Sequence, residues 1–379
     1  MIYLDNSATT KPFPEVVESF VQVTNQFYAN PSSIHHFGGQ SEKLLTSARE
    51  QVAKLLDVIP DEIIFTSGGT EGNNLAIKGI AYKHQNRGKH IITTAIEHPS
   101  VLETFQQLER EGFSVTYLPV DENGQVAVED VTQAITDKTI LLSMMHVNNE
   151  TGAIQPVEKI GTIAKKYPKL VFHVDAVQSI GKIPLQLNNS GIDSCTISGH
   201  KIHGLKGTGI LYVNQKISLQ PLFTGGQQEF SLRSGTENLA GAVSIARALR
   251  LIKEKEANEH NHLVKLHNLL VRGLQDIQEV TINSPKNGAP HIVNLSLPGF
   301  KPEVIIHALG EENIFISTRS ACSSKRDDES HVLAACGFDT ARTTSALRIS
   351  MSYDTTETDI EKFLHILRRT IDQLKNVME

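Results

Sequence analysis

Between about residues 60 and 215, short apolar runs rich in β-branched residues alternate with stretches of helical periodicity. Such alternation is typical of a largely parallel sheet covered by helices, because parallel strands are joined by crossovers that are usually helical. The sequence therefore predicts an α/β fold whose sheet has seven strands. The predicted strands are Glu62–Thr66, His90–Thr94, Val115–Leu118, Ile140–Met145, Leu170–Asp175, Ser194–Ser198 and Gly209–Val213, and the clearest helices between them are Asn73–Asn86, Val101–Glu111 and Val157–Tyr167.

The C-terminal part of the chain has a different pattern. A long stretch, roughly Glu237–Leu274, predicts one or two helices that lead out of the predicted α/β region. A chain of 379 residues exceeds the usual size of one core. We expect a large domain at residues 14–257 and a smaller α+β domain made of residues 1–13 and 258–379. The elements predicted in its later part are the strands Val293–Leu297, Ile314–Thr318 and Ala346–Met351 and the helices Glu303–Glu311 and Thr356–Lys375.

Composition excludes several classes of protein. The net charge of −6 argues against a general nucleic-acid-binding surface. No apolar run approaches the length needed to cross a membrane, and residues 1–6 lack the features of a signal peptide. The three cysteines contain no C-x-x-C pair, which fits a reducing compartment. We therefore expect a cytoplasmic protein with no membrane partner and no direct nucleic-acid partner.

Polar clusters follow four of the predicted strands. They are Thr66–Thr70, His146–Glu150, Asp175, and the pair His200 and Lys201. In open α/β sheets, ligands bind outside the carboxyl ends of the strands. We therefore expect the four clusters to line one crevice.

Lys201 has the surroundings of an aldehyde-binding lysine. A lysine amine can form a Schiff base with pyridoxal 5′-phosphate (PLP), and a carboxylate such as Asp175 can keep the pyridine nitrogen protonated. Gln178 follows Asp175 by one helical turn, and Ser198 and His200 are donors suited to phosphate oxygens. Taken singly, Lys201 is more often a solvated lysine and Asp175 a helix cap. The combination predicts a PLP site.

The segment Ser67–Glu71 joins a predicted strand to a predicted helix. Gly68 and Gly69 let the backbone approach an anion closely, the helix start offers free N–H groups, and Thr70 adds a hydroxyl. An ordinary glycine turn with a helix cap explains the segment equally well when it is considered alone. The spacing fits neither a Walker loop nor a dinucleotide-binding fingerprint.

Two further polar residues have open interpretations. His98 follows a predicted strand, where it could cap a helix or stack on a pyridine ring and relay protons. Arg348 interrupts an apolar strand, and a buried arginine needs a carboxylate partner. That partner is either a protein Asp or Glu, or the α-carboxylate of a substrate. His260 and His262 lie two positions apart on a predicted helix and do not share a face, so no metal site is predicted there.

Cys322 lies in a run of small and polar residues, 317–328, without apolar periodicity. Such a run predicts an exposed loop. Because free cysteines are normally buried, a cysteine on a loop indicates a chemical role. Cys195 lies within a predicted strand and Cys336 follows an apolar helical segment, so both are interpreted as structural.

Short motifs along nearly the whole chain, taken together and in order, match one family. They resemble those of the cysteine desulfurases of the NifS/IscS group, which are PLP-dependent enzymes of fold type I in the class V aminotransferase family. The long polar stretch Ala321–Ser330 favours this group over the short-loop SufS type. The motifs are Tyr3–Thr10, Asn30–Ser33, Thr66–Glu71, Glu97–His98, Met145–Gly152, His173–Gln178, Ser198–Lys201, Arg233–Thr236 and Ser320–Cys322.

The resemblance implies a role for each matching position in the cofactor site. Lys201 is expected to bind the PLP aldehyde covalently and to move protons during catalysis. Asp175 is expected to pair with the ring nitrogen, Gln178 to reach the phenolic oxygen, and His98 to stack on the ring and take part in catalysis. The remaining cofactor-binding positions implied by the family are Gly69, Thr70, Asn149, Ser198, His200 and, from the second subunit of a homodimer, Thr236.

The resemblance also implies the reaction. Asn149, Arg348 and Asn30 are expected to hold the carboxylate of L-cysteine, and Cys322 to be the nucleophile that takes its sulfur as a persulfide and leaves L-alanine. The sulfur then passes to an acceptor protein, either an iron–sulfur scaffold or a tRNA-thiolating enzyme. Charged residues at Lys325–Asp328, where the family has mostly small ones, hint at a dedicated acceptor.

Two other functions remain open from the sequence. One is a related PLP reaction, such as that of a selenocysteine lyase or another class V aminotransferase-family enzyme, which would not need Cys322 as an obligatory nucleophile. The other is a sulfur-carrier or binding protein that kept the fold without catalysis. Turnover of cysteine, and its dependence on Lys201 and Cys322, distinguishes them.

Overall fold

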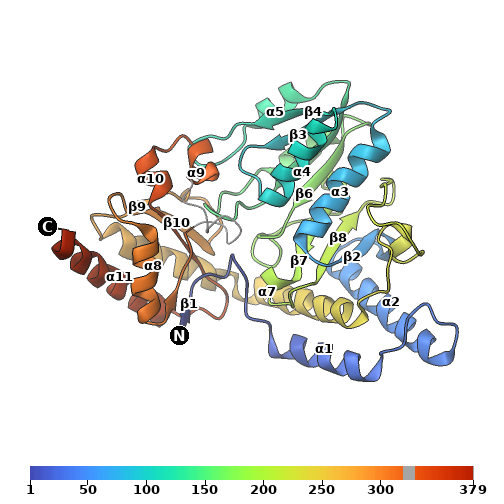
Figure 1. The fold of residues 1–379 in the computed structure, drawn as a ribbon, viewed down its shortest axis with the longest axis horizontal. Helices are drawn as coiled ribbons and strands as arrows, with labels where there is room; N and C mark the ends of the chain where they lie inside the picture. Colours follow the sequence, from blue (N-terminus) through green and yellow to red (C-terminus); the bar gives the residue numbers. More distant parts are fainter. Residues whose placement is uncertain (319–328, 379) are drawn as a thin grey trace.

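The large sheet organises the first part of the molecule (Figure 1). The computed structural model describes residues 1–318 and 329–378, and within them seven strands form this sheet in the order β2-β8-β7-β6-β5-β3-β4. Strand β8 is antiparallel to β2 and β7, and the other neighbouring pairs are parallel. The predicted α/β fold is thereby confirmed. The strands are β2 (Ile63–Thr66), β3 (His90–Thr94), β4 (Ser114–Leu118), β5 (Thr139–Met145), β6 (Val171–Asp175), β7 (Ser194–Ser198) and β8 (Gly209–Val213).

Helices cover both faces of this sheet. Consecutive strand residues point to opposite faces, and here both directions are apolar. Ile91 and Leu141 pack on one face, while Ile92 and Leu142 pack on the other. Apolar residues of α3 and α4 join the first cluster, and those of α5, α6 and α7 join the second. These helices are α3 (Gly69–His84), α4 (Pro99–Arg110), α5 (Val128–Ala134), α6 (Val157–Ala164) and α7 (Leu239–Gln275).

Helix α7 connects the two parts of the structure. The stretch predicted as one or two helices is a single helix of 37 residues, which corresponds to a length of about 55 Å. Near its start it packs against α1 (Pro14–Gln26) and α2 (His36–Leu56), neither of which was predicted. Further along it contacts β9, β10 and α11 of the C-terminal part (Figure 1).

The C-terminal part is an α+β unit. Its antiparallel sheet has the order β12-β10-β9, and β1 pairs with β11 in parallel. Strand β11 is shorter than the predicted Ile314–Thr318, because Ser317 instead makes an isolated bridge to Arg348 of β12. The elements are β1 (Ile2–Tyr3), β9 (Thr281–Ile282), β10 (Ile292–Ser296), α8 (Pro302–Glu311), β11 (Ile314–Phe315), α9 (His331–Ala335), α10 (Thr340–Thr344), β12 (Ala346–Ser350) and α11 (Glu357–Met378).

We propose that the domain division follows the sequence-based boundaries, with residues 14–257 in the large domain and residues 1–13 and 258–379 in the small one. The division is supported by the sheets, because β2 to β8 all lie in the first range, and β1 and β9 to β12 lie in the others. In the described part of the chain, no helix is both long enough and apolar enough to span a membrane.

Candidate active site

The carboxyl ends of several strands surround one cavity, as the four polar clusters suggest. Residues from all four clusters line it, together with His98, Arg348 of β12 and the N-terminal residues Ser7 and Ala8. The predicted site residues that the structure brings together here are Gly69, Thr70, His98, Asn149, Asp175, Gln178, Ser198, His200, Lys201 and Arg348.

Asp175 ends β6, and its buried carboxylate is held by two donors. Its Oδ2 accepts a hydrogen bond from Asn73 Nδ2 at 2.8 Å, and its Oδ1 accepts one from the Val177 N–H at 2.9 Å. Asn73, on α3, also donates to Ser100 Oγ at 2.9 Å and was not predicted as a site residue. These contacts fix the direction of the carboxylate, and its remaining lone pairs are available to a protonated ring nitrogen.

Lys201 ends the short 3-10 helix η2 (Gly199–Lys201) that follows β7. Its Nζ donates to Ala8 O at 2.8 Å and also to Ser7 O. Gln178 Nε2 donates to the same Ser7 carbonyl at 3.0 Å. The N-terminal segment therefore forms one wall of the cavity, a contact between residues more than 170 positions apart that no local pattern predicts.

The start of α3 forms the anion-binding end of the cavity. The backbone at Gly69 packs closely against the Val177 side chain, because a Cβ at Gly69 would lie 3.0 Å from Val177 Cγ2. The free N–H groups of the first turn and the Ser198 and Thr70 hydroxyls are donors for a phosphate. Burial lowers the pKa of His200 to about 4, and the neighbouring Lys201 adds to this, so the imidazole is neutral and donates from one nitrogen.

Arg348 has a protein carboxylate as its partner, one of the two alternatives raised by the sequence. Its Nη2 lies 2.9 Å from Asp5 Oδ1, and its Nη1 donates to Asn149 O at 2.9 Å. Its Nε has no partner among the described residues, although only 1% of the side chain is exposed. The guanidinium edge at Nε therefore keeps a donor for a further acceptor.

His98 caps a helix, as the simpler interpretation held. Its Nδ1 accepts from the Ser100 N–H at 3.1 Å at the start of α4, and it lies 2.9 Å from Ser100 Oγ. Burial lowers the pKa of His98, whereas the nearby Asp175 carboxylate opposes that shift. A neutral ring at the cavity wall can stack on an aromatic group and exchange a proton through its second nitrogen.

Three predicted site residues do not line this cavity. Asn30 is exposed between α1 and α2, where its Oδ1 accepts from the Ser32 N–H at 2.8 Å. Thr236 is exposed as well. Cys322 lies outside the described residues. Cys195 and Cys336 are free and buried, as their interpretation as structural residues requires.

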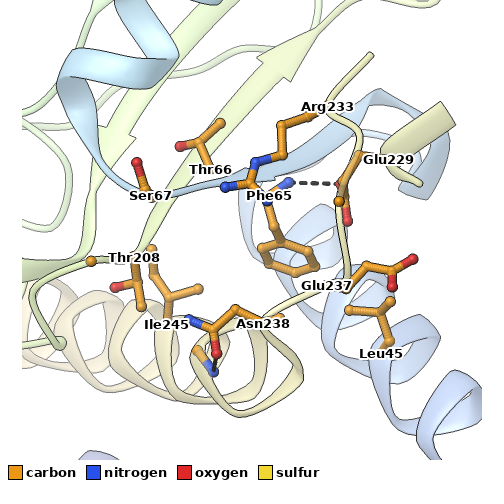
Figure 2. A pocket seen from close by; sticks show the side chains of 15 residues that line it. Leu45, Phe65, Thr66, Ser67, Thr208, Glu229, Arg233, Glu237, Asn238 and Ile245 are labelled. Carbon is orange, nitrogen blue, oxygen red and sulfur yellow. Dashed lines mark hydrogen bonds between the residues drawn. The ribbon is translucent and has the colours of Figure 1, made fainter. Parts of the chain in front are cut away.

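Thr236 stands in sequence between two residues that line a second cavity (Figure 2). Its neighbours Gly235 and Glu237 line that cavity together with Ser67. Arg233 Nε donates to Glu71 Oε1 at 2.9 Å, and the other oxygen of Glu71 accepts from the Ser67 N–H at 2.8 Å. The segment around Thr236 is thereby tied to the turn that carries the anion-binding end of the first cavity.

Glu97 is a buried acid next to His98. Its Oε1 accepts from Thr94 Oγ1 at 2.6 Å and from the Met145 N–H at 3.0 Å, while its Oε2 has no partner among the described residues. Burial raises the pKa of Glu97 to about 8, and the Asp175 carboxylate adds to the rise. The carboxyl is therefore largely protonated at neutral pH.

We expect Glu97→Gln to remove a pH-dependent loss of stability. Since the folded-state pKa of about 8 lies above the ordinary value of 4.5, the contribution of Glu97 is fully present below pH 4.5 and is lost as pH rises toward 8. The amide cannot ionise, so the variant should gain roughly 3 to 4 kcal/mol over the natural chain between pH 5 and pH 8. Melting temperatures measured across this range test it, and parallel curves for the two proteins would contradict it.

Comparison with known proteins supports the interpretation of this cavity as a PLP site. The family profile described as Aminotransferase class-V matches residues 2–363. A protein of Clostridium botulinum named cysteine desulfurase IscS is 43% identical over 380 residues, covering 99% of this chain and 96% of the relative. A NifS/IcsS protein homolog of Lactobacillus delbrueckii subsp. bulgaricus is 46% identical over 369 residues, with 96% and 95% covered.

Solved structures of similar proteins have the same fold over nearly the whole chain. A NifS-like protein superimposes with a TM-score of 0.92 at 39% identity, covering 98% of this chain and 99% of the other. The apo cysteine desulfurase of Thermococcus onnurineus NA1 superimposes with a TM-score of 0.88 at 26% identity, with 98% and 95% covered. The chain therefore belongs to the class V aminotransferase family, within its group of PLP-dependent cysteine desulfurases.

Proposed function

We propose that this chain is a PLP-dependent cysteine desulfurase that converts L-cysteine to L-alanine and leaves a persulfide on Cys322. One observation carries the proposal: Lys201, Asp175, Gln178 and Arg348 open into a single cavity. An amine, an anchor for the ring nitrogen and a donor for the substrate carboxylate are the groups that this chemistry needs in one place.

The lining of the cavity fits PLP. Four of its residues carry buried polar atoms without a partner among the described residues, namely Ser7 Oγ, Asn73 Oδ1, Gln178 Oε1 and Arg348 Nε. Buried polar atoms are normally hydrogen-bonded, so such a group around one cavity indicates a polar ligand. Lys201 would bind the aldehyde, and Asp175 the ring nitrogen. Gly69, Thr70, Ser198 and His200 would bind the phosphate, with Gln178 and His98 beside the ring and Asn149 close to it.

When bound, PLP supplies an aldehyde that joins to the cysteine amine and a ring that accepts electrons from the α-carbon. Arg348 and Asn149 orient the cysteine carboxylate. The Lys201 amine removes the α-proton, and Asp175 keeps the ring nitrogen protonated. The Cys322 thiolate attacks the substrate sulfur: a sulfur–sulfur bond forms, the carbon–sulfur bond breaks, and the carbon keeps its electron pair and takes up a proton as alanine.

The functional unit in this proposal is a homodimer. Thr236 and Asn30 are exposed and do not line the cavity of their own chain, and in this proposal they contact the ligand bound by the other copy. The exposed phenylalanines Phe223 and Phe230 precede Thr236 in the chain. Exposed apolar side chains in this segment suit a contact between subunits. The proposal also includes a cytoplasmic location and a sulfur acceptor, either an iron–sulfur scaffold or a tRNA-thiolating enzyme.

Replacing Cys322 with alanine tests the proposed reaction. We expect alanine formation from cysteine to fall below about 1% of the natural rate, because the other two thiols, Cys195 and Cys336, are buried. Cysteine binding should still change the absorption of PLP. Cys336→Ala is the matched control, since burial leaves that thiol 6% exposed and raises its pKa to about 11. Undiminished alanine formation in Cys322→Ala would exclude a desulfurase and favour a selenocysteine lyase or another class V reaction.

Replacing Arg348 with lysine tests the substrate carboxylate site. A lysine keeps the charge but has no counterpart of the Nε donor, so we expect KM for cysteine to rise roughly 10- to 100-fold with a smaller change in kcat. Arg342→Lys is the control, because Arg342 bonds to Asn283 Oδ1 at 2.7 Å outside the cavity. An unchanged KM in a folded Arg348→Lys protein would remove Arg348 from the site.

A further inference from the structure

Lys182 is a buried lysine directly behind the candidate active site. It lies in the turn after β6, and only 2% of its surface is exposed. Its ammonium donates a hydrogen bond to the backbone carbonyl of Lys201 at 3.0 Å. Within residues 1–318 and 329–378, no carboxylate forms an ion pair with it.

The turn that presents Lys182 is fixed by its neighbours. Gly181 has a φ of +75°, and a Cβ at that position would lie 2.4 Å from Ile252 Cγ1, so only glycine fits. The Tyr353 hydroxyl donates to Gly181 O at 3.0 Å. Asp175, which ends β6, and Gln178, in the turn itself, come a few residues earlier in the chain. A single rigid connection therefore links the ring-binding side chains to the backbone of Lys201.

Several neutral or positive groups surround Lys182, and the carboxylates that act on the same residues are Asp354, near His203, and Glu256 and Glu259, near Tyr353. The neutral or positive groups are His200 and Lys201 on η2, His203 just after it, His291 before β10, and the Tyr353 phenol. Burial is the main cause of the lowered pKa values of the three histidines, and the charge of Lys182 lowers each of them further. Burial also lowers the pKa of Lys182 itself to about 8, which leaves it charged at neutral pH.

A buried ammonium with a carbonyl as its acceptor and no counter-ion is an unfavourable arrangement for stability alone. We propose that Lys182 is a positioning residue for Lys201: it holds the Lys201 carbonyl in place and puts a positive charge behind the nitrogen that binds the cofactor. Such a charge opposes protonation of that nitrogen. The inference rests on the proposed function, since it requires PLP at Lys201.

The test is a pH titration of the absorption of PLP bound at Lys201, in the full-length holoenzyme. Lys182→Met removes the charge and keeps the length of the chain, so we expect the midpoint of the titration to rise by roughly half a pH unit or more. Lys182→Arg keeps the charge and should keep the midpoint of the natural protein. Lys216→Met removes an exposed lysine in the loop after β8 that does not line the cavity, and it should leave the midpoint unchanged.

Melting curves of the apo-proteins show which variants are folded. If Lys182→Met does not fold, Lys182→Gln takes its place in the titration. A folded, charge-free variant that titrates like the natural protein would overturn the inference, as would an equal rise in Lys182→Arg. Failure of the proposed function looks different, because the natural chain would then show no PLP absorption to titrate.

Discussion

Lys201→Ala is expected to abolish cysteine turnover, with a loss of roughly 10⁴-fold or more. The change removes the amine that binds the cofactor aldehyde and the base that takes the α-proton, and general-base catalysis alone contributes up to about 10⁴-fold. It also removes the hydrogen bonds from Nζ to the carbonyls of Ser7 and Ala8, but Thr10 still donates to His200 O, so the N-terminal wall of the cavity stays linked to η2.

Two measurements separate these effects. Alanine formation from cysteine reports catalysis, and the absorption of the purified protein reports covalently bound PLP. We expect Lys201→Ala to lose both while its melting temperature stays close to that of the natural chain. Lys206→Ala is the control, because this exposed lysine follows Lys201 by five positions and should leave both unchanged. Full activity in Lys201→Ala would place the chemistry on another lysine.

Asp175→Asn is expected to lower kcat by roughly 10²- to 10³-fold. The amide has nearly the same shape, so it still accepts the Val177 N–H, but it cannot stabilise a protonated ring nitrogen by charge. Breaking one side of a buried charge pair costs about 3–5 kcal/mol, which corresponds to a loss of this order. We also expect weaker retention of PLP, measured as cofactor remaining after dialysis.

A half-buried aspartate, Asp193, provides the control. Asp193 lies just before β7, at the opposite end of the sheet, where its Oδ2 accepts from the Phe172 N–H at 2.9 Å. Asp193→Asn changes the same chemical group on a neighbouring strand, away from the cavity, and should leave kcat and PLP retention unchanged. Equal losses in both variants would mean that Asp175 acts through general stability.

Most strands of the large sheet could be predicted because they are buried on both faces, whereas the edge strand β4 is only partly buried. Their sequences are therefore short, almost continuous apolar runs that end at polar residues, and each predicted boundary lies within one residue of the observed one. Helices α1 and α2 were not predicted. Their buried residues face α7, which lies more than 180 positions along the chain. The apolar partner of each helix therefore cannot be identified from the neighbouring sequence.

The site was predictable where a residue's neighbours in sequence carry the signal. Lys201 and Asp175 stand at strand ends beside other polar residues. Asn73 gave a weaker signal: it shares a helix face with Ile77 and Ile80, and a polar residue within such an apolar stripe indicates a buried hydrogen bond. The Asp5–Arg348 pair gave none, because its partners are 343 residues apart and meet only where isolated bridges join Asp5 and Ser317 to β12.

The attachment of PLP to one particular lysine is the point on which the proposed chemistry depends. Reduction of the purified protein with borohydride fixes the cofactor to the amine that holds it, and mass mapping of its peptides then identifies that residue. We expect the label on the peptide that contains Lys201 and on no other. A label on a different lysine, or none after reconstitution with PLP, would contradict the proposed site.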